Sequence, residues 1–259
     1  MADGSLEATR SVARALRGAT RAVALTGAGI STGAGIPDFR GPQGIYVTRA
    51  YPEDVFDLDV FLAEPQGFYA FARDFLALRE RIRPTFTHEF LAQLERDGRL
   101  AGVVTQNIDG LHQLAGSRQV VEVHGGFERA VCVACEDSFA TREIEAEVAA
   151  GEIPHCRRCG GLVKPDIVFF GEAVKGMDRA EELVRGCDLL LVIGSSLTVF
   201  PAAGLPALAL GPIIVVTRGP VSVPFGAKRV DADIEAFFRG VAAALASPGE
   251  TGQRGPAAR

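Results

Sequence analysis

The sequence predicts an α/β fold with a parallel β-sheet at its core and a small insert, and three observations support this prediction. Short apolar runs of the kind that form buried parallel strands stop abruptly at polar residues or glycine. Between these runs lie segments whose apolar residues have helical spacing. One insert contains two Cys-x-x-Cys pairs, Cys132 with Cys135 and Cys156 with Cys159. The length of 259 residues suits one large domain that carries such an insert.

The elements can be assigned in chain order from these patterns. The pattern over residues 5–18 predicts an amphipathic helix, because Leu6, Val12 and Leu16 lie on one side. In residues 51–80, phenylalanines recur at helical spacing, which is typical of core packing. Strands are predicted at 21–25, 103–105, 120–123, 188–193 and 213–217, and further helices at 87–96, 178–185 and 233–246.

The composition limits the partners and the compartment. A net charge of -5 and a pI near 5.5 argue against nucleic acid or an anionic membrane surface as the main partner. The N-terminal residues lack the apolar core of a secretory signal, and no run of about 18 apolar residues could span a bilayer. We therefore expect a cytoplasmic protein without a membrane partner. Residues 247–259, rich in proline and glycine, are expected to be disordered.

Polar side chains gather where the predicted strands end. Gln106, Asn107 and Asp109 follow one strand, and His124 follows the next. Ligands of open α/β sheets bind at the carboxyl ends of the strands, so we expect these four residues to face one crevice. A similar polar cluster, 194–196, follows a later strand.

A glycine-rich turn, 26–31, follows the first predicted strand and reads Thr-Gly-Ala-Gly-Ile-Ser. Such a turn can bring backbone N–H groups to a diphosphate, and a tight structural turn is an equal alternative. The glycine spacing differs from that of dehydrogenases, and no clear acidic residue follows where it would bind a ribose. The irregular segment 35–41 is interpreted as an ordered lid, with a surface loop as the alternative.

The four cysteines of the insert predict a structural zinc site. Two Cys-x-x-Cys pairs separated by residues 136–155 can bring four thiolates to one tetrahedral ion. Such a site keeps no open position, so we expect it to stabilise the fold and not to perform chemistry. His155 could replace a ligand, but four thiolates make this unnecessary. Cys187 precedes an apolar run and is expected to be buried.

The segment 162–172 is apolar and contains Pro165. This combination suits an edge strand that pairs with an incoming extended peptide, and an ordinary edge strand is an equal alternative. His88 and His112 are expected to have structural hydrogen-bonding roles and not catalytic ones.

Taken together, the motifs resemble those of the sirtuins, a family of NAD-dependent protein-lysine deacylases. The resemblance runs from about residue 10 to residue 245 and implies a Rossmann-like parallel-sheet domain with a smaller lobe made of a zinc-ribbon module and a helical insert. The motifs that carry it occur in the family's order at 27–31, 35–41, 105–112, 123–125, the two Cys-x-x-Cys pairs, 164–172 and 194–197. The implied division is 1–40, 89–126 and 166–246 for the NAD-binding domain, 41–88 for the helical insert, 127–165 for the zinc module and 247–259 for the tail.

The resemblance also implies the reaction. NAD is the expected co-substrate, and an acylated protein bound as an extended peptide is the expected partner of a monomeric enzyme. The acyl oxygen would attack the ribose C1′ to give an alkylimidate, and His124 is similar to the family's general base. Gln106 and Asn107 would orient the ribose and a water. Free lysine, nicotinamide and 2′-O-acyl-ADP-ribose are the implied products. The implied NAD-binding residues are Gly27, Ala28, Gly29, Ser31, Asp38, Phe39, Arg40, Gln106, Asn107, Ile108, Asp109, Gly194, Ser195, Ser196 and Thr217, and those that flank the acyl-lysine are Val168, Phe169, Phe170 and Gly171.

Two positions depart from patterns in the family. Sirtuins that prefer succinyl- or malonyl-lysine carry Tyr-x-x-Arg in the insert helix, whereas here Tyr69 is followed three residues later by Ala72, with Arg73 one position further. One residue rotates a side chain by about 100° around a helix, so we expect a preference for neutral acyl groups, acetyl first. Many sirtuins have Asn where this chain has Thr217, whose shorter side chain could weaken NAD binding.

Other interpretations of the motifs are less favoured. The same NAD site would serve a protein mono-ADP-ribosyltransferase, but His124 and Asn107 favour deacylation. A non-enzymatic NAD- or nucleic-acid-binding zinc module conflicts with the acidic charge and the complete polar set. A dehydrogenase conflicts with the glycine spacing.

Overall fold

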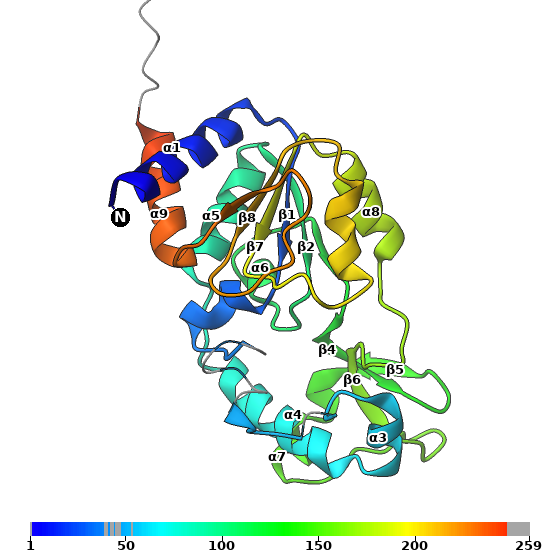
Figure 1. The fold of residues 1–259 in the computed structure, drawn as a ribbon. Coiled ribbons are helices and arrows are strands. Elements are labelled where there is room, and N and C mark those ends of the chain that lie inside the picture. Colours follow the sequence, from blue (N-terminus) through cyan, green and yellow to red (C-terminus); the bar gives the residue numbers. More distant parts are fainter. Residues whose placement is uncertain (1, 39–40, 42–43, 45–47, 53, 248–259) are drawn as a thin grey trace, which may run out of the picture.

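The computed structural model describes residues 2–38, 41, 44, 48–52 and 54–247 and has two lobes (Figure 1). The upper lobe contains a six-stranded sheet and the lower lobe a three-stranded one. The predicted α/β fold with a smaller lobe is therefore confirmed. Of the predicted tail, residues 248–259 lie outside the described residues, as do Phe39 and Arg40 of the predicted lid.

The large sheet is parallel throughout, in the order β3-β2-β1-β7-β8-β9. The chain starts at the middle strand, builds outward in one direction, and then returns to the other side of β1. In such sheets, ligands bind where the order reverses, here outside the carboxyl ends of β1 and β7. The strands are β1 Ala22–Thr26, β2 Leu100–Thr105, β3 Val120–Glu122, β7 Leu189–Ile193, β8 Ile213–Val216 and β9 Lys228–Val230.

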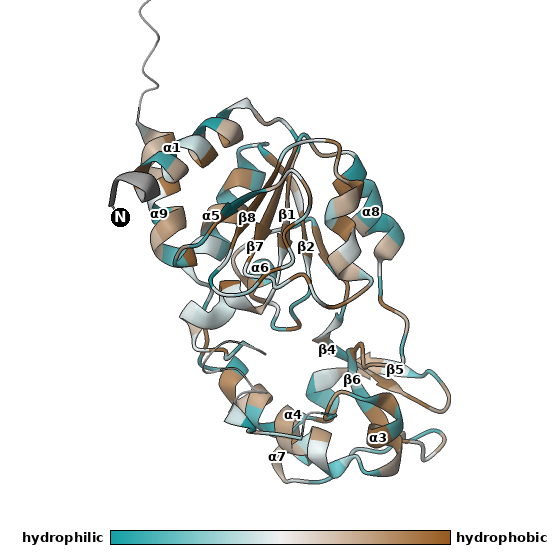
Figure 2. Cartoon of the chain, in the orientation of Figure 1, coloured by the Kyte–Doolittle hydropathy of each residue, from teal (hydrophilic) through white to brown (hydrophobic). Residues whose placement is uncertain are grey.

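Most strands of the large sheet agree with the prediction, and two details differ. The predicted strand 120–123 ends at Glu122 and is half-buried, because β3 lies at the edge of the sheet and is covered less than its neighbours. β9 is not among the predicted strands, because it is three residues long and two of them are exposed and basic. Figure 2 shows the central strands as the most hydrophobic part of the molecule.

Helices cover both faces of this sheet. On one face, α1 (Ala2–Gly18), α5 (Phe86–Arg96) and α9 (Ile234–Ala246) pack into one apolar core, to which Leu16, Leu91 and Phe238 contribute. On the other face lie α8 (Met177–Arg185) and the 3-10 helix η3 (Ala202–Leu208). The predicted helices are thus confirmed to within three residues at their ends. No described helix is long and apolar enough to cross a membrane.

The lower lobe combines the two segments that the sequence assigned to inserts. Its antiparallel sheet has the order β5-β4-β6, and its aromatic core unites residues 55–75 with residues 127–169. The phenylalanines at helical spacing are core residues, as predicted. The elements are α3 Leu58–Ala63, α4 Gln66–Arg79, β4 Gly125–Cys132, β5 Ser138–Ala140, η2 Thr141–Glu143, α7 Glu145–Ala149 and β6 Val163–Ile167.

Candidate active site

The turns that follow β1 and β7 pack directly on each other. The Gly27 N–H donates to the Ile193 carbonyl oxygen at 3.0 Å, and the Gly29 N–H donates to the Gly194 carbonyl oxygen at 2.9 Å. A Cβ on Gly29 would lie 2.7 Å from the Gly194 Cα, so a side chain does not fit there. The element that includes this turn, η1 (Ala28–Ala34), is a 3-10 helix. These glycines therefore serve tight backbone packing at the sheet's switch point.

Three polar side chains from two elements form a buried network beside this turn. The Ser31 hydroxyl donates to Asp109 Oδ2 at 2.7 Å and accepts from Asn107 Nδ2 at 3.0 Å. The other carboxylate oxygen, Oδ1, accepts the Leu111 N–H at 2.9 Å at the start of the short helix α6 (Leu111–Leu114). Ser31 is fully buried, and Asp109 and Asn107 are 7% and 9% exposed. The network fixes both oxygens of the carboxylate in one orientation.

Gln106 connects the ends of three strands. Its backbone N–H donates to the Thr26 carbonyl oxygen at 2.9 Å, and its Nε2 donates to the Ser195 hydroxyl, also at 2.9 Å. Ser195 in turn accepts the Leu197 N–H at 3.2 Å. The polar residues that end β1, β2 and β7 therefore lie together.

His124 is held at the edge of the same group of residues. Its Nδ1 lies 2.9 Å from the Gln106 carbonyl oxygen. A carbonyl only accepts hydrogen bonds, so Nδ1 carries the proton and Nε2 keeps its lone pair. Burial is the main cause that lowers the pKa of His124, and the backbone hydrogen bond only partly opposes it. The imidazole is therefore neutral at pH 7 and can accept a proton.

Gly125, directly after His124, has no room for a side chain. Its φ of 69° lies in the left-handed region, and a Cβ would lie 2.0 Å from the Asp166 carbonyl oxygen. This close approach joins the start of β4 to the end of β6. It sets the direction in which the chain leaves His124.

The segment 168–171 bridges the two lobes. The Val168 N–H donates to the His124 carbonyl oxygen at 2.8 Å, and the Phe170 N–H donates to the Phe56 carbonyl oxygen at 2.8 Å. Phe170 is 51% exposed, whereas Phe169 is 1% exposed and its ring packs among the phenylalanines of the lower lobe. The structure thus leaves the Phe170 side chain, and not that of Phe169, available at the surface. β6, which precedes the segment, is an edge strand, as predicted.

Three further residues of the expected NAD site lie near the ends of β8 and β7 and in the expected lid. Thr217 is buried at the end of β8, and its hydroxyl lies 3.4 Å from the Arg218 carbonyl oxygen. Ser196 is partly exposed and lies 2.9 Å from the Thr198 hydroxyl. In the expected lid, the Asp38 carboxylate accepts the Gly41 N–H at 2.8 Å.

The four predicted zinc ligands form one cluster in the lower lobe. All four Sγ atoms lie within 4.8 Å of one another, with Cys132 and Cys159 at 3.5 Å and Cys135 and Cys156 at 3.7 Å. A tetrahedral ion with Zn–S bonds of about 2.3 Å separates its sulfurs by about 3.8 Å, so the cluster fits zinc. His155 turns its Nδ1 to the Gly160 carbonyl oxygen instead.

Two other histidines form a buried pair behind the network. The rings of His88 and His112 lie 4.7 Å apart, edge to face, and His112 Nε2 lies 2.9 Å from the Thr26 hydroxyl. His88 Nδ1 accepts the Thr85 N–H at 3.2 Å. Burial lowers the pKa of both, that of His88 to about 4. Both are neutral at pH 7, which agrees with the expected structural role.

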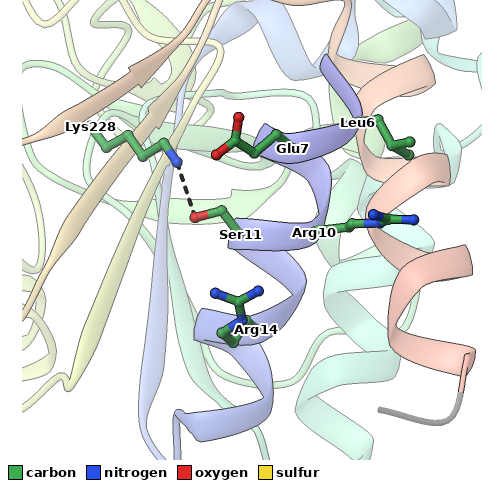
Figure 3. Close-up of a pocket in the computed structure, with 6 residues that line it drawn as sticks. All are labelled: Leu6, Glu7, Arg10, Ser11, Arg14 and Lys228. Atoms are coloured by element: carbon green, nitrogen blue, oxygen red, sulfur yellow. Dashed lines mark hydrogen bonds between the residues drawn. The ribbon is translucent and has the colours of Figure 1, made fainter. Parts of the chain in front are cut away.

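A separate hollow of about 370 Å³ lies beside α1, as shown in Figure 3. Lys228 donates there to the Ser11 hydroxyl at 3.0 Å. None of the residues that line this hollow belongs to the polar network at the strand ends. They are Leu6, Glu7, Arg10, Ser11, Arg14 and Lys228.

Comparisons with known proteins agree on one family. The Sir2 family model matches residues 27–201. An NAD-dependent protein deacetylase of Thermotoga maritima is 43% identical over 202 residues, which cover 76% of this chain and 81% of that protein. One of Haloarcula marismortui is 47% identical over 214 residues, which cover 78% and 80%.

Solved structures give the same result. One, described as "Structural Basis for the Mechanism and Regulation of Sir2 Enzymes", has a TM-score of 0.85 and 36% identity, with 92% of this chain and 97% of that chain covered. A Sir2 variant with a deacetylated peptide and 3′-O-acetyl ADP ribose has a TM-score of 0.82 and 38% identity, with 90% and 96% covered.

Proposed function

Because the chain belongs to the Sir2 family, we propose that the polar residues at its strand ends catalyse the NAD-dependent deacetylation of protein lysine, with His124 as the general base. The chain is an NAD-dependent protein deacetylase by family and by fold. The observation that most supports His124 as the base is its orientation: the hydrogen bond of Nδ1 fixes the ring and leaves Nε2 unprotonated.

We place NAD along the switch point of the sheet. When bound, NAD supplies an electrophilic ribose carbon and a nicotinamide leaving group. The Gly27–Gly29 turn lies where the diphosphate of a nucleotide meets the first strand of such folds, and Ser195 and Thr217 lie at the ends of β7 and β8, where the adenosine would extend. Ser31, Gln106, Asn107, Ile108 and Asp109 complete the proposed site, together with Gly194, Ser196 and the lid residues 38–40.

Asp109 is suited to hold a carboxamide. A carboxylate accepts from the amide NH₂, and a backbone N–H such as that of Ile108 can donate to the amide oxygen. The bonds from Ser31 and Leu111 fix the carboxylate before a ligand binds. A preorganised carboxylate orients the ring without a cost of rearrangement at the moment of reaction.

His124 is suited to accept a proton from the ribose. Its Nε2 accepts a proton from a ribose hydroxyl, and the resulting positive charge is stabilised by the Nδ1–H bond to the Gln106 carbonyl. Asn107, held by Ser31, has an amide oxygen with which it orients a water or hydroxyl group. The lowered pKa of His124 keeps the base ready at neutral pH.

The substrate is proposed to bind as an extended peptide along the 168–171 segment. Related structures are described with acetylated and propionylated peptides bound to Sir2. In this chain, β6 offers a sheet edge, and the exposed Phe170 follows two residues after Val168, whose N–H donates to the His124 carbonyl oxygen. The absence of Tyr-x-x-Arg supports neutral acyl groups, because Ala72 is fully buried and the Arg73 guanidinium pairs with Asp74 at 3.7 Å.

Zinc stabilises the lower lobe and takes no part in the reaction, since Cys132, Cys135, Cys156 and Cys159 fill its coordination. We also propose a monomeric cytoplasmic enzyme whose partners do not include nucleic acid, and domain boundaries as given by the sequence. The acidic net charge supports the absence of a nucleic-acid partner.

Mass spectrometry tests the proposal. The protein is incubated with NAD and an acetyl-lysine peptide, with His124→Tyr as the control variant. We expect deacetylated peptide and O-acetyl-ADP-ribose to appear together, and only when His124 is present. A protein that gains the mass of ADP-ribose while the peptide stays acetylated would instead support mono-ADP-ribosyl transfer.

A further inference from the structure

Lys164 carries a charge inside the lower lobe. Its side chain is 2% exposed, and its Nζ lies 2.9 Å from Glu172 Oε2. The same ammonium donates to the Ile167 carbonyl oxygen at 2.6 Å and faces the ring of Phe169, 4.5 Å from its centroid. A buried lysine costs free energy, because burial disfavours the charged form, and these three contacts offset that cost.

Glu172 uses one oxygen for two purposes. Oε2 pairs with Lys164 and also accepts the Phe169 N–H at 2.8 Å. The Glu172 N–H returns a bond to the Phe169 carbonyl oxygen at 3.0 Å, and Gly171 between them has a φ of 96°. The two hydrogen bonds between Phe169 and Glu172 close a tight turn over residues 169–172, and the ion pair connects this turn to Lys164 on β6.

This turn lies between His124 and helix α3 of the lower lobe. On one side, Val168 is bonded to the carbonyl of His124. On the other side, the carbonyl of Phe170 accepts the Leu58 N–H at 3.1 Å. A change in the turn would therefore move the exposed Phe170 ring relative to His124, without any contact to the residues that end β1 and β7.

We propose that Lys164 and Glu172 form a positioning pair that sets the 168–171 segment for the acylated peptide. This inference rests on the proposed function, because it assigns the segment to the peptide. The pair acts through the segment and does not touch the reacting atoms. An apolar residue of similar size in place of Lys164 would fill the same space, so packing alone does not require the charge.

The test compares Glu172→Gln with Glu182→Gln in the full-length zinc-loaded enzyme. Glu182 pairs with Arg179 on the exposed face of α8, so the second variant makes the same chemical change outside the site. Steady-state kinetics give separate KM values for the acetylated peptide and for NAD. For Glu172→Gln we expect the peptide KM to rise about tenfold, which corresponds to about 1.4 kcal/mol, while the NAD KM stays within about twofold. Glu182→Gln should change neither.

A second variant separates the loss of the ion pair from misfolding caused by an unpaired buried charge. Glu172→Gln leaves the Lys164 ammonium buried without its anion, whereas Lys164→Met with Glu172→Gln removes both charges and should fold well. The double variant should also show the raised peptide KM, because the turn has lost its ionic bond. A peptide KM equal to that of the unmodified enzyme in the double variant would overturn the proposal, as would equal rises of both KM values. An unmodified enzyme without deacetylase activity would instead contradict the proposed function.

Discussion

Replacing His88 with glutamine tests whether the buried histidine pair makes the fold sensitive to acid. His88 is the third residue of α5 and closes the capping box at its start, where its Nδ1 accepts the Thr85 N–H. Glutamine is favoured at this position of a capping box, so His88→Gln keeps the cap and removes the titrating group. The variant therefore separates protonation from helix capping.

The magnitude follows from the pKa of His88, which burial lowers from 6.5 to about 4 against a smaller opposing effect of Asp109. Below pH 6.5 the unfolded chain binds a proton that the native chain does not, so stability falls as the pH falls toward the native pKa. At pH 5, about 1.5 pH units below the unfolded value, the loss is about 2 kcal/mol at ~1.36 kcal/mol per unit. Burial, the main cause that lowers the pKa of His112, is present in both proteins, so most of the His112 contribution cancels from the difference; only the smaller lowering by His88 is lost in the variant.

The cost has a visible structural origin. Among the described residues, neither His88 Nε2 nor His112 Nδ1 has a hydrogen-bond partner, although both atoms are buried. A proton added to either ring would place an unsolvated charge beside the other ring, 4.7 Å away.

The assay is urea unfolding followed by circular dichroism between pH 8 and pH 5, with excess zinc in every sample so that the cysteine site stays loaded. The free energy of unfolding of the unmodified protein minus that of His88→Gln should be constant from pH 8 to pH 7. It should then shift by about 2 kcal/mol in favour of the variant by pH 5. A difference in the free energy of unfolding that stays constant down to pH 5 would refute the lowered pKa of His88.

The remaining predictions concern the backbone, the metal and the acyl group. Gly125→Ala should lose at least about 1–3 kcal/mol of stability, because its φ becomes strained and its Cβ clashes with Asp166, and most of the activity should be lost with it. Gly67→Ala is the matched control, because Gly67 lies within α4 with open space around it. This variant should be as stable as the unmodified protein or more stable in the same thermal melts. Cys132→Ala should lose its zinc, measured by inductively coupled plasma mass spectrometry, and become less soluble, and a soluble, active, zinc-free variant would contradict the structural role. Acetyl-lysine peptides should be turned over at least about tenfold faster, by kcat/KM, than succinyl-lysine peptides, because the chain has Ala72 and not Arg at the position that would pair with the free carboxylate of the succinyl group. A faster desuccinylation would show that the interpretation of this helix is wrong.

Local patterns in the sequence predict much of the molecule. The strands of the central sheet and the zinc ligands depend on short-range features, namely apolar runs, turn residues and the spacing of cysteines. The fold class, the family and the cysteine cluster are confirmed. The roles assigned to single residues of the NAD and peptide sites stay predictions, and for Phe39 and Arg40 the described residues add nothing.

The sequence by itself determined which chemical groups are present and which strand ends carry them. Only the tertiary structure decided how these groups contact one another: that Ser31 links Asn107 to Asp109, that Phe169 faces inward while Phe170 faces outward, and that Lys164 is buried against Glu172. The physical reason is the distance along the chain between the partners. A hydrogen bond between Ser31 and Asp109 joins residues on opposite sides of a whole insert, and only the packing of the sheet and the lower lobe brings such residues within reach.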